Sequence, residues 1–335
     1  MRVAIVHDDL VQWGGAERVL EGICEIYPDA PVYTSVFDRS NPELKKRFEN
    51  KKVVTSFLQE IPGWKSLYKI LLPFYGLAFE QFDFSEFDLV ISHTTRFAKS
   101  IITKPETIHI CYCHTPPRFL WHFSGEKSYG IPELLMSKLR LYDQVSARRV
   151  DYFLAGSENA KKRIKKVYRM DAKVVYPFVD LDRFKNIETF DGGYFVVLAR
   201  PSKYKRLDLA ETACLELNWP LKVIRGSLTD AGVVSILAGC RALIVPGEED
   251  FGLTPLEAQA LGKPVIALGL GGALETVVDG QTGLFFCDQS VEGLTEAINK
   301  FETLKFDPKL LKENVTKFSK LIFTANFKQT IASLL

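Results

Sequence analysis

Apolar positions along the chain fall into short runs that alternate with segments of helical spacing. Ten runs have the length and composition of strands: 3–7, 31–36, 89–92, 108–113, 152–155, 173–176, 194–199, 221–224, 242–245 and 264–268. Most are apolar at successive positions, so both faces would be buried, which is typical of parallel strands covered by helices. Their alternation with helical segments predicts an α/β fold built on parallel sheets.

The number of strands and the length of 335 residues predict two domains. We place the boundary after the run at 173–176, because Gly192 and Gly193 begin a fresh series of strand, loop and helix. This gives an N-terminal domain at 1–177 and a C-terminal domain at 178–316. At 317–335, apolar residues at near-helical spacing predict an amphipathic closing helix that packs back on the N-terminal domain.

Composition changes this picture little. The chain is 47% hydrophobic and 25% charged, as in a soluble globular protein with a full core. The net charge of +2 gives no overall attraction to nucleic acid, and no nucleic-acid-binding motif is present. The six cysteines form no Cys-x-x-Cys pair, which favours a reducing cytoplasm. The acidic turn after the first short strand predicts no signal peptide, and no apolar run approaches the ~20 residues of a transmembrane helix.

Two glutamates flank an Asp-Phe-Gly turn in the last third of the chain. The run at 242–245 leads into a loop, so Glu249 is predicted beyond the carboxyl end of a buried strand, where open α/β sheets bind ligands. Glu257 is predicted in the first turn of the next helix, with Thr254 as N-cap and Pro255 at the first position. A capping box would explain Glu257 by itself, so a structural and a ligand-binding role both remain open.

Cations and glycines occupy positions where they would bind phosphate. Arg200 and Lys205 flank a loop at the end of the run at 194–199, where two cations would converge on a diphosphate. Gly14 and Gly15 precede a helix whose amino end favours an anion and whose backbone a ligand can approach closely. Solvated loop charges and an ordinary tight turn are the alternative explanations.

Two further loops follow predicted strands. The run at 108–113 is followed by His114, an imidazole that can donate or accept a hydrogen bond at neutral pH; a buried, satisfied histidine is the ordinary alternative. The loop after the run at 264–268 contains Gly271 and Gly272, which would let backbone amides reach a ligand or would simply form a tight turn.

Together these motifs resemble glycosyltransferase family 4, in its mannosyltransferase-like branch of polysaccharide biosynthesis. The resemblance rests on Glu-x7-Glu at 249–257, Arg-x4-Lys at 200–205, Gly-Gly-Ala-Glu-Arg-Val at 14–19, Phe-Glu-Gln-Phe-Asp at 79–83, Tyr-Cys-His-Thr-Pro at 112–116, Tyr-Pro-Phe-Val-Asp at 176–180 and Gly-Gly-x-x-Glu at 271–275. These motifs occur in the family's order over most of the chain. The family implies the GT-B architecture, in which two Rossmann-like parallel-sheet domains face a cleft.

The resemblance implies a retaining enzyme that moves a hexose, with mannose from GDP-mannose as the expected donor, onto a lipid-linked or polysaccharide acceptor. Glu249 would contact the donor sugar and Glu257 the ribose. Arg200 and Lys205 would hold the diphosphate, and His114 would lie near sugar and acceptor. The donor site would also include Gly14, Gly15, Phe251, Gly252, Leu253, Gly271 and Gly272. No metal and no cofactor other than the nucleotide sugar is expected, because cations and helix-terminal amides stabilise the charge.

The chain departs from the family pattern in two places. After the run at 221–224, Arg225 leads straight into the helix before 242–245, so about one βα unit is missing. His122 stands where relatives commonly carry Asp. The missing unit keeps open a catalytically silent GT-B scaffold that binds a nucleotide or a partner protein. Asp38 allows a weaker third hypothesis, a nicotinamide oxidoreductase, which the absent Gly-x-Gly-x-x-Gly fingerprint disfavours.

The segment at 57–84 is rich in aromatic residues and contains Lys65 and Lys69, near basic residues at 45–47 and 51–52. Such a surface would attach to an anionic bilayer without spanning it. A core-facing segment with a charged outer face is the alternative. We therefore expect a cytoplasmic protein that can be peripheral at the inner face of the cell membrane.

Overall fold

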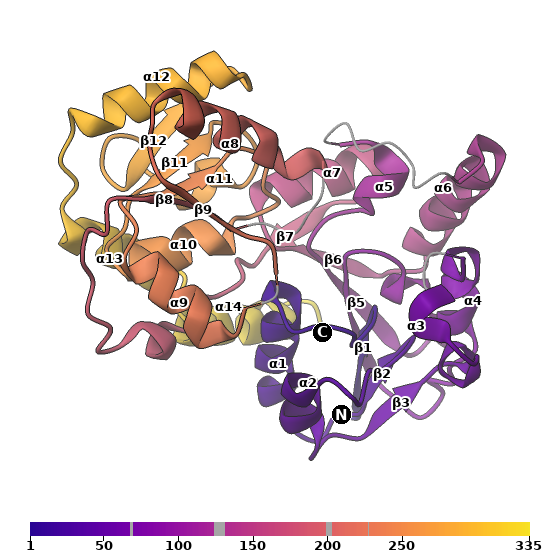
Figure 1. Ribbon diagram of the computed structural model, residues 1–335. Helices are drawn as coiled ribbons and strands as arrows, with labels where there is room; N and C mark the ends of the chain where they lie inside the picture. The colour runs from indigo at the N-terminus through magenta and orange to yellow at the C-terminus, as the bar shows by residue number, and fades with distance from the viewer. Residues whose placement is uncertain (68–69, 124–130, 199–202, 227) are drawn as a thin grey trace. The chain divides into compact units, whose positions relative to one another are not determined.

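The computed structural model describes residues 1–67, 70–123, 131–198, 203–226 and 228–335. The described chain divides into two compact units (Figure 1). Unit 1 contains the described residues of Met1–Phe123, Lys127–Tyr176 and Thr324–Leu335, and unit 2 contains those of Pro177–Phe323. The chain thus passes from unit 1 into unit 2 next to the predicted boundary at residue 177, and returns to unit 1 within its last helix.

Unit 1 is built on a seven-stranded sheet with the order β3-β2-β1-β4-β5-β6-β7. Its strands are β1 Val3–His7, β2 Val32–Thr34, β3 Val53–Thr55, β4 Leu89–Thr94, β5 Ile108–Cys113, β6 Tyr152–Ala155 and β7 Ala172–Val174, and every neighbouring pair is parallel. The strand order reverses between β1 and β4. Ligand sites of open α/β sheets lie outside the carboxyl ends of the strands at such a reversal.

Helices cover both faces of this sheet (Figure 1). They are α1 Gly15–Ile26, α2 Pro42–Phe48, α3 Trp64–Leu67, α4 Tyr75–Glu80, α5 Arg118–Trp121, α6 Glu133–Ala147, α7 Glu158–Tyr168 and the end of α14 Lys320–Ala332, with 3-10 turns η1 Phe57–Glu60, η2 Leu72–Phe74 and η3 Ala98–Ser100. Helix α1 begins at the predicted Gly15 and buries Val19, Leu20, Ile23 and Cys24. These four residues lie at helical spacing and form the apolar face of the helix, whereas Tyr27, at the same spacing, is the C-cap beyond the helix end.

Unit 2 contains a five-stranded parallel sheet with the order β12-β11-β10-β8-β9. The elements are β8 Phe195–Leu198, β9 Leu221–Ile224, β10 Leu243–Val245, β11 Val265–Leu268 and β12 Gly283–Phe286, with η4 Leu181–Phe184, η5 Lys203–Lys205, α8 Leu207–Glu216, α9 Asp230–Ala238, α10 Leu253–Ala260, α11 Ala273–Thr276, α12 Val291–Glu302 and α13 Pro308–Thr316. Helices α8 and α12 lie side by side over one face (Figure 1). Helix α9 is the one described element between β9 and β10, as the missing βα unit predicted.

Each of the ten predicted strands overlaps an observed one, and the bounds of β1, β5, β6 and β9 agree with the prediction. Two strands were missed, β3 with three residues and β12 with four, and both lie at a sheet edge. A run this short shows no periodicity, so its strand structure depends on the neighbour that it pairs with.

The last helix buries a narrower face than its sequence predicted. Phe323, Phe327 and Ile331 are buried at helical spacing, whereas Leu321 is 81% exposed. The ring of Phe327 lies 6.1 Å from that of Tyr112 in unit 1. Helix α14 therefore begins in unit 2 and ends as part of the core of unit 1.

The aromatic segment at 57–84 is mostly core. Trp64, Tyr75, Phe79, Phe82 and Phe84 are buried in the cluster that covers one face of the unit 1 sheet. Their side chains are therefore not available to a bilayer, and the core-facing alternative holds for them. A smaller set of apolar side chains in this segment remains exposed: Phe57, Ile70, Phe74 and Leu77. The predicted Lys69 lies outside the described residues.

Candidate active site

Three histidines form a chain of contacts at the carboxyl edge of the unit 1 sheet. His7 ends β1 and stands opposite His93 of β4 in the strand register, and His114 follows β5. The Nδ1 atoms of His7 and His93 are 2.9 Å apart, and the Nε2 atoms of His93 and His114 are 2.7 Å apart. His7 and His93 are buried. The predicted site residue His114 is therefore the outermost of three linked imidazoles.

Carboxylates beside His7 influence the charge of the three linked histidines. Burial alone would lower the pKa of His7, but Glu17, whose Oε1 lies 3.9 Å from Nε2, together with Asp8 and Asp9 raises that pKa above its ordinary value. Burial and the neighbouring imidazoles hold the pKa of His93 well below its ordinary value. The carboxylates thus favour the charged form of His7, and burial favours the neutral form of His93.

These charge states fix where the protons lie. A charged His7 carries a proton on both nitrogens and donates from Nδ1 to Nδ1 of His93. Neutral His93 then carries its own proton on Nε2 and donates it to Nε2 of His114. A neutral His114 consequently carries its proton on Nδ1. The buried pair thus sets the tautomer of the residue that the sequence singled out, in the way that a hydrogen bond at one ring nitrogen decides which nitrogen is protonated.

Asp8 organises the backbone of the loop after β4. Its Oδ1 accepts hydrogen bonds from the amides of Phe97 and Ala98, both at 2.8 Å, and its Oδ2 accepts one from the amide of Thr95 at 2.6 Å. Burial would raise the pKa of Asp8, but the charge of Arg96 and these amides hold it below its ordinary value. The neighbouring Asp9 forms an ion pair with Arg96. These residues were not predicted from the sequence, although charged residues directly after a buried strand were a usable signal.

The glycine turn at the start of α1 is present. Gly14 is the N-cap with an extended backbone, and no side chain caps the helix there. Gly15 is the first helical residue, so the amides of the first turn, which have no partner within the helix, come soon after the carboxyl end of β1. This is a suitable geometry for an anion.

In unit 2, the structure brings Lys205 and Glu249 together. Lys205 lies in η5 after β8, and Glu249 lies in the loop after β10. The Nζ atom of Lys205 donates to Oε1 of Glu249 at 2.6 Å, and the two side chains are 16% and 17% exposed. Arg200, the predicted partner of Lys205, lies outside the described residues. Two of the side chains expected at the donor therefore share one position at the carboxyl edge of this sheet.

Glycines allow the loops of this edge to pack backbone against backbone. A Cβ at Gly247 would lie 2.2 Å from the carbonyl oxygen of Tyr204, so only glycine lets the loop after β10 approach η5. A Cβ at Gly272 would lie 2.3 Å from Cα of Phe251. The amide of Gly272 also donates to the carbonyl of Glu249 at 2.9 Å. The Gly271–Gly272 loop therefore supports the Glu249 loop, besides any contact that it makes with a ligand.

The predicted capping box at Glu257 is wrong. Gly252, with φ of 104°, is the N-cap of α10, so the helix begins at Leu253, before Thr254 is reached. Pro255 fits the third helical position because amides of the first turn have no partner within the helix. The Oε1 atom of Glu257 accepts a hydrogen bond from Nη1 of Arg183 at 2.6 Å.

Arg183 joins Glu257 to a second carboxylate. Its Nε donates to Oδ2 of Asp230 at 2.8 Å, and Asp230 is the first residue of α9. Arg183 lies in η4, a segment for which the sequence predicted no site residue. The start of α9, in the connection between β9 and β10, therefore lies next to this arginine.

The remaining predicted residues have plainer surroundings. The ring of Phe251 is buried and lies 5.4 Å from that of Phe318. Asp38 accepts a hydrogen bond from Lys65 at 2.6 Å and belongs to a local polar cluster. His122 has a left-handed backbone conformation, and its Nε2 atom lies 3.0 Å from Nη2 of Arg140. In the part of the chain that the structure describes, no group of three His, Cys, Asp or Glu side chains is arranged to hold a metal ion.

Two protein families match this sequence. The model described as Glycosyltransferase Family 4 matches residues 13–183, slightly more than half of the chain, and the model described as Glycosyl transferases group 1 matches residues 216–318. The alpha-1,3/1,6-mannosyltransferase ALG2 of Homo sapiens is 24% identical over an alignment that covers 89% of this chain and 86% of that protein. The enzyme of the same name from Dictyostelium discoideum is 41% identical over 30% of this chain and 25% of its own.

Solved structures share the fold. Sucrose-phosphate synthase from Thermosynechococcus elongatus superposes with a TM-score of 0.73 at 14% identity, over 100% of this chain and 99% of that one. The lipopolysaccharide outer core galactosyltransferase WaaB has a TM-score of 0.70 at 16% identity, over 100% of both chains. These are GT-B glycosyltransferases, and the two parallel-sheet α/β units described above are the two domains of that fold. The chain therefore belongs to glycosyltransferase family 4 and is a glycosyltransferase.

Proposed function

We propose that the enzyme transfers mannose from GDP-mannose to a lipid-linked acceptor, with retention of configuration at the anomeric carbon. The observation that carries the proposal is the Lys205–Glu249 pair, a cation and a carboxylate held together where the resemblance expects diphosphate and sugar. The choice of mannose is supported by relatives named as mannosyltransferases that align over most of both chains. The nucleotide sugar is the only cosubstrate in this proposal.

The chemistry assigns different tasks to the two members of the pair. Lys205 would turn from Glu249 to the diphosphate and neutralise the charge that grows as the sugar–phosphate bond breaks. Glu249 would accept hydrogen bonds from sugar hydroxyls. The acceptor oxygen would attack from the face that the leaving group vacates and pass its proton to a β-phosphate oxygen. Arg200, carried over from the family motif, would share the diphosphate with Lys205.

His114 would act as a hydrogen-bond donor to a sugar hydroxyl. The chain of imidazoles leaves its proton on Nδ1, as derived above from the charge of His7. Gly14 and Gly15 would present free amides of α1 to the phosphates. Glu257 would hold the ribose, in which case it must exchange its contact with Arg183 for the ribose hydroxyls.

A donor panel tests the proposal. Purified protein is incubated with GDP-mannose, UDP-glucose, UDP-galactose or ADP-glucose and a polyprenyl-diphosphate-linked saccharide in detergent, and the product's anomeric configuration is read by NMR. We expect transfer from GDP-mannose at least tenfold faster than from the others, with the α-linkage of the donor retained. Preference for a uridine donor would overturn the mannose assignment. Absence of transfer from every donor would revive the silent-scaffold hypothesis.

Attachment to the cytoplasmic face of a membrane is the second part of the proposal. Ile70, Phe74 and Leu77, at near-helical spacing, are 69%, 47% and 53% exposed. Of the basic residues nearby, Lys51 donates hydrogen bonds to three carbonyl oxygens at the end of α1, and Lys65 forms an ion pair with Asp38. Both ammonium groups are therefore engaged within the protein. No helix formed by the described residues is long and apolar enough to cross a membrane. The exposed apolar side chains would therefore contribute to holding the protein at the surface.

Vesicle sedimentation tests this part. We compare wild type with Ile70→Gln/Phe74→Gln/Leu77→Gln, and use Leu215→Gln, a 77% exposed leucine of unit 2, as the control substitution. The triple variant should lose most of its binding to anionic vesicles, while the control binds as wild type does. Because the apolar contribution is not screened, high salt should reduce wild-type binding only in part. Recovery of wild type in the supernatant at low salt would refute membrane attachment.

A further inference from the structure

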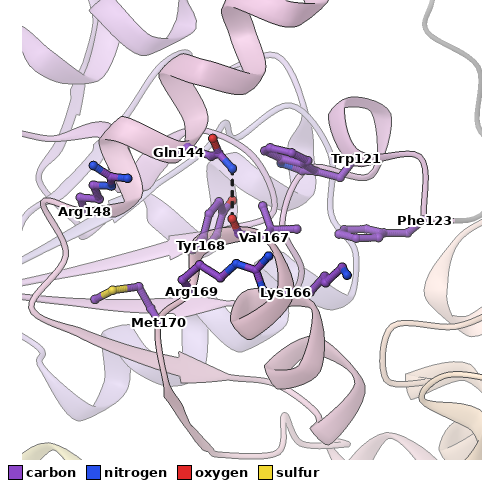
Figure 2. A pocket seen from close by; sticks show the side chains of 9 residues that line it. All are labelled: Trp121, Phe123, Gln144, Arg148, Lys166, Val167, Tyr168, Arg169 and Met170. Atoms are coloured by element: carbon purple, nitrogen blue, oxygen red, sulfur yellow. Dashed lines mark hydrogen bonds between the residues drawn. The ribbon is translucent and has the colours of Figure 1, made fainter.

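A hollow of about 730 Å³ opens between the carboxyl ends of α6 and α7 in unit 1. Figure 2 shows Trp121 and Phe123 on one side of it and Arg148 and Met170 on the opposite side. Lys166 and Arg169 complete its lining along a third side. The volume lies within the range of small-molecule sites in proteins. None of the roles assigned above uses this hollow.

Two aromatic side chains that line the hollow, Trp121 and Tyr168, are held by a buried ion pair. Lys99 and Asp143 are 1% and 0% exposed, and their Nζ and Oδ1 atoms are 2.5 Å apart. The second carboxylate oxygen of Asp143 accepts hydrogen bonds from Nε1 of Trp121 at 2.7 Å and from the hydroxyl of Tyr168 at 2.9 Å. Both rings are therefore held in place before any ligand arrives, which lowers the entropy lost on binding.

The charged residues among the described lining are all basic. Arg148, Lys166 and Arg169 contribute three positive charges, and none of the nine described residues that line the hollow is acidic. Among the described residues, none of these three cations takes part in an ion pair. Their positions at helix carboxyl ends are also favoured by the helix dipole, but the dipole does not require them to face one hollow. A concave site lined by one sign of charge concentrates ions of the opposite sign.

We propose that this hollow binds the phosphate end of the lipid-linked acceptor, an inference that rests on the lipid-linked acceptor of the proposed function. Guanidinium groups hold phosphate oxygens in pairs, which suits Arg148 and Arg169. The first carbons of the lipid chain would lie along Trp121, Phe123 and Met170. Free inorganic phosphate would leave these apolar walls uncovered, so a phosphate that carries an apolar chain fits both halves of the lining.

The hollow is also connected to the segment that carries His114. The guanidinium carbon of Arg163 lies 4.7 Å from the centre of the Phe123 ring. Its Nη1 lies 3.2 Å from the hydroxyl oxygen of Thr115, to which it donates. Thr115 directly follows His114, so one wall of the hollow reaches the candidate active site of unit 1 through two contacts. A change at Phe123 on ligand binding would therefore be felt by Arg163 and Thr115, next to His114.

A binding experiment tests the inference without relying on catalysis. Geranyl phosphate, geraniol and inorganic phosphate are titrated separately into wild-type protein by calorimetry. The test variant is Arg148→Gln/Arg169→Gln. The control, Lys138→Gln/Lys162→Gln, removes the same charge from exposed positions of the same two helices outside the hollow. We expect wild type and control to bind geranyl phosphate at least tenfold more tightly than geraniol or inorganic phosphate, and the test variant to lose that preference. Equal affinity for inorganic phosphate, or unchanged binding by the test variant, would overturn the proposal.

A kinetic experiment separates this inference from the proposed function. With GDP-mannose as donor, the test variant should raise the KM for the diphosphate-linked acceptor at least tenfold and leave the KM for GDP-mannose unchanged. It should also leave turnover of a phosphate-free alkyl glycoside acceptor unchanged. If wild type transfers mannose but the variant keeps its acceptor KM, the inference fails and the function stands. If wild type transfers nothing yet binds geranyl phosphate through the two arginines, the function fails and the lipid-phosphate site stands. Equal binding of wild type and test variant to vesicles that contain a polyprenyl phosphate would also count against the site.

Discussion

The polar groups of the two units are held in opposite ways. In unit 1, Lys99, Asp143 and His93 are almost completely buried and each is fixed by other buried groups. In unit 2, the pairs Lys205–Glu249 and Arg183–Glu257 lie on loops with side chains 13–17% exposed. The buried groups maintain a fixed geometry, whereas the partly exposed pairs can exchange partners at low cost. We infer that unit 1 contributes a rigid surface and that unit 2 contributes charges that reorganise around an anion.

The largest expected effect is on the stability of unit 1. Asp143→Ala leaves the ammonium of Lys99 buried without its partner and removes the acceptor of Trp121 and Tyr168, so the free energy of unfolding should fall by about 3–5 kcal/mol. The variant Lys99→Met/Asp143→Leu, which replaces both charges by apolar groups, should recover much of this loss. Urea unfolding measures both. A loss below about 1 kcal/mol for Asp143→Ala would contradict the rigid role that we assign to this pair.

In unit 2, breaking a pair should affect catalysis rather than stability. Lys205→Gln should reduce kcat by about 10²–10³, as the loss of one preorganised transition-state donor does. Its free energy of unfolding should change by less than about 1 kcal/mol, because partly exposed ion pairs contribute little. Arg200→Gln should reduce kcat likewise. The loss of transition-state stabilisation in the double variant should be smaller than the sum of the two single losses, because both side chains act on one anion. Lys203→Gln, in the same turn, serves as the control, and unchanged turnover in Lys205→Gln would remove this lysine from the site.

Glu257 offers a smaller and more specific test. If it holds the ribose, Glu257→Gln should weaken nucleotide binding by about 1.5–3 kcal/mol, the usual contribution of a hydrogen bond to a charged group. The melting temperature should change little, because Glu257 caps no helix. Asp230→Asn also disturbs Arg183 but leaves Glu257 in place, so its nucleotide affinity should remain that of wild type. Calorimetry with GDP measures both, and an unchanged affinity in Glu257→Gln would argue for a purely structural contact with Arg183.

The remaining effect concerns pH and is spread over two histidines. All five histidines belong to unit 1, so histidine titration should change the stability of that unit alone. Burial lowers the pKa of His93, and that of His109 to about 3, so below about pH 6.5 the unfolded chain binds protons that the folded chain does not. Each of these two histidines should lower the free energy of unfolding by up to about 1.4 kcal/mol per pH unit as the pH falls. His7, with its raised pKa, acts in the opposite sense: its contribution is complete below about pH 6.5 and is lost as the pH rises through the raised value.

Amide hydrogen exchange, which resolves the two units, measures this effect. Between pH 6.5 and 5, protection should decrease in unit 1 and should decrease less in His93→Asn than in wild type. His7→Asn should remove the loss of protection on the alkaline side. Equal pH dependence in both units would show that other groups dominate.

The fold could be predicted well from the sequence because parallel strands buried on both faces are apolar at successive positions. The sequence placed β1, β5 and the carboxyl edge near His114 correctly, since strand ends in a parallel sheet share one edge. It did not find His93 or Arg183, because their importance depends on pairing with residues 86 and 74 positions away. Spacing along the chain carries no information about such partners. The capping box failed for a local reason, since Gly252, two residues before Thr254, is already the N-cap of the helix.

The path of α14 affects how the protein is made. Unit 2 is continuous in sequence, whereas unit 1 needs residues 324–335, including the buried Phe327 and Ile331, to complete its core. Unit 2 is therefore an insertion within unit 1. On the ribosome, where the chain emerges from its amino end, unit 2 can close while unit 1 still waits for its last segment. The amino-terminal half of the enzyme, although synthesised first, is the half that finishes folding last.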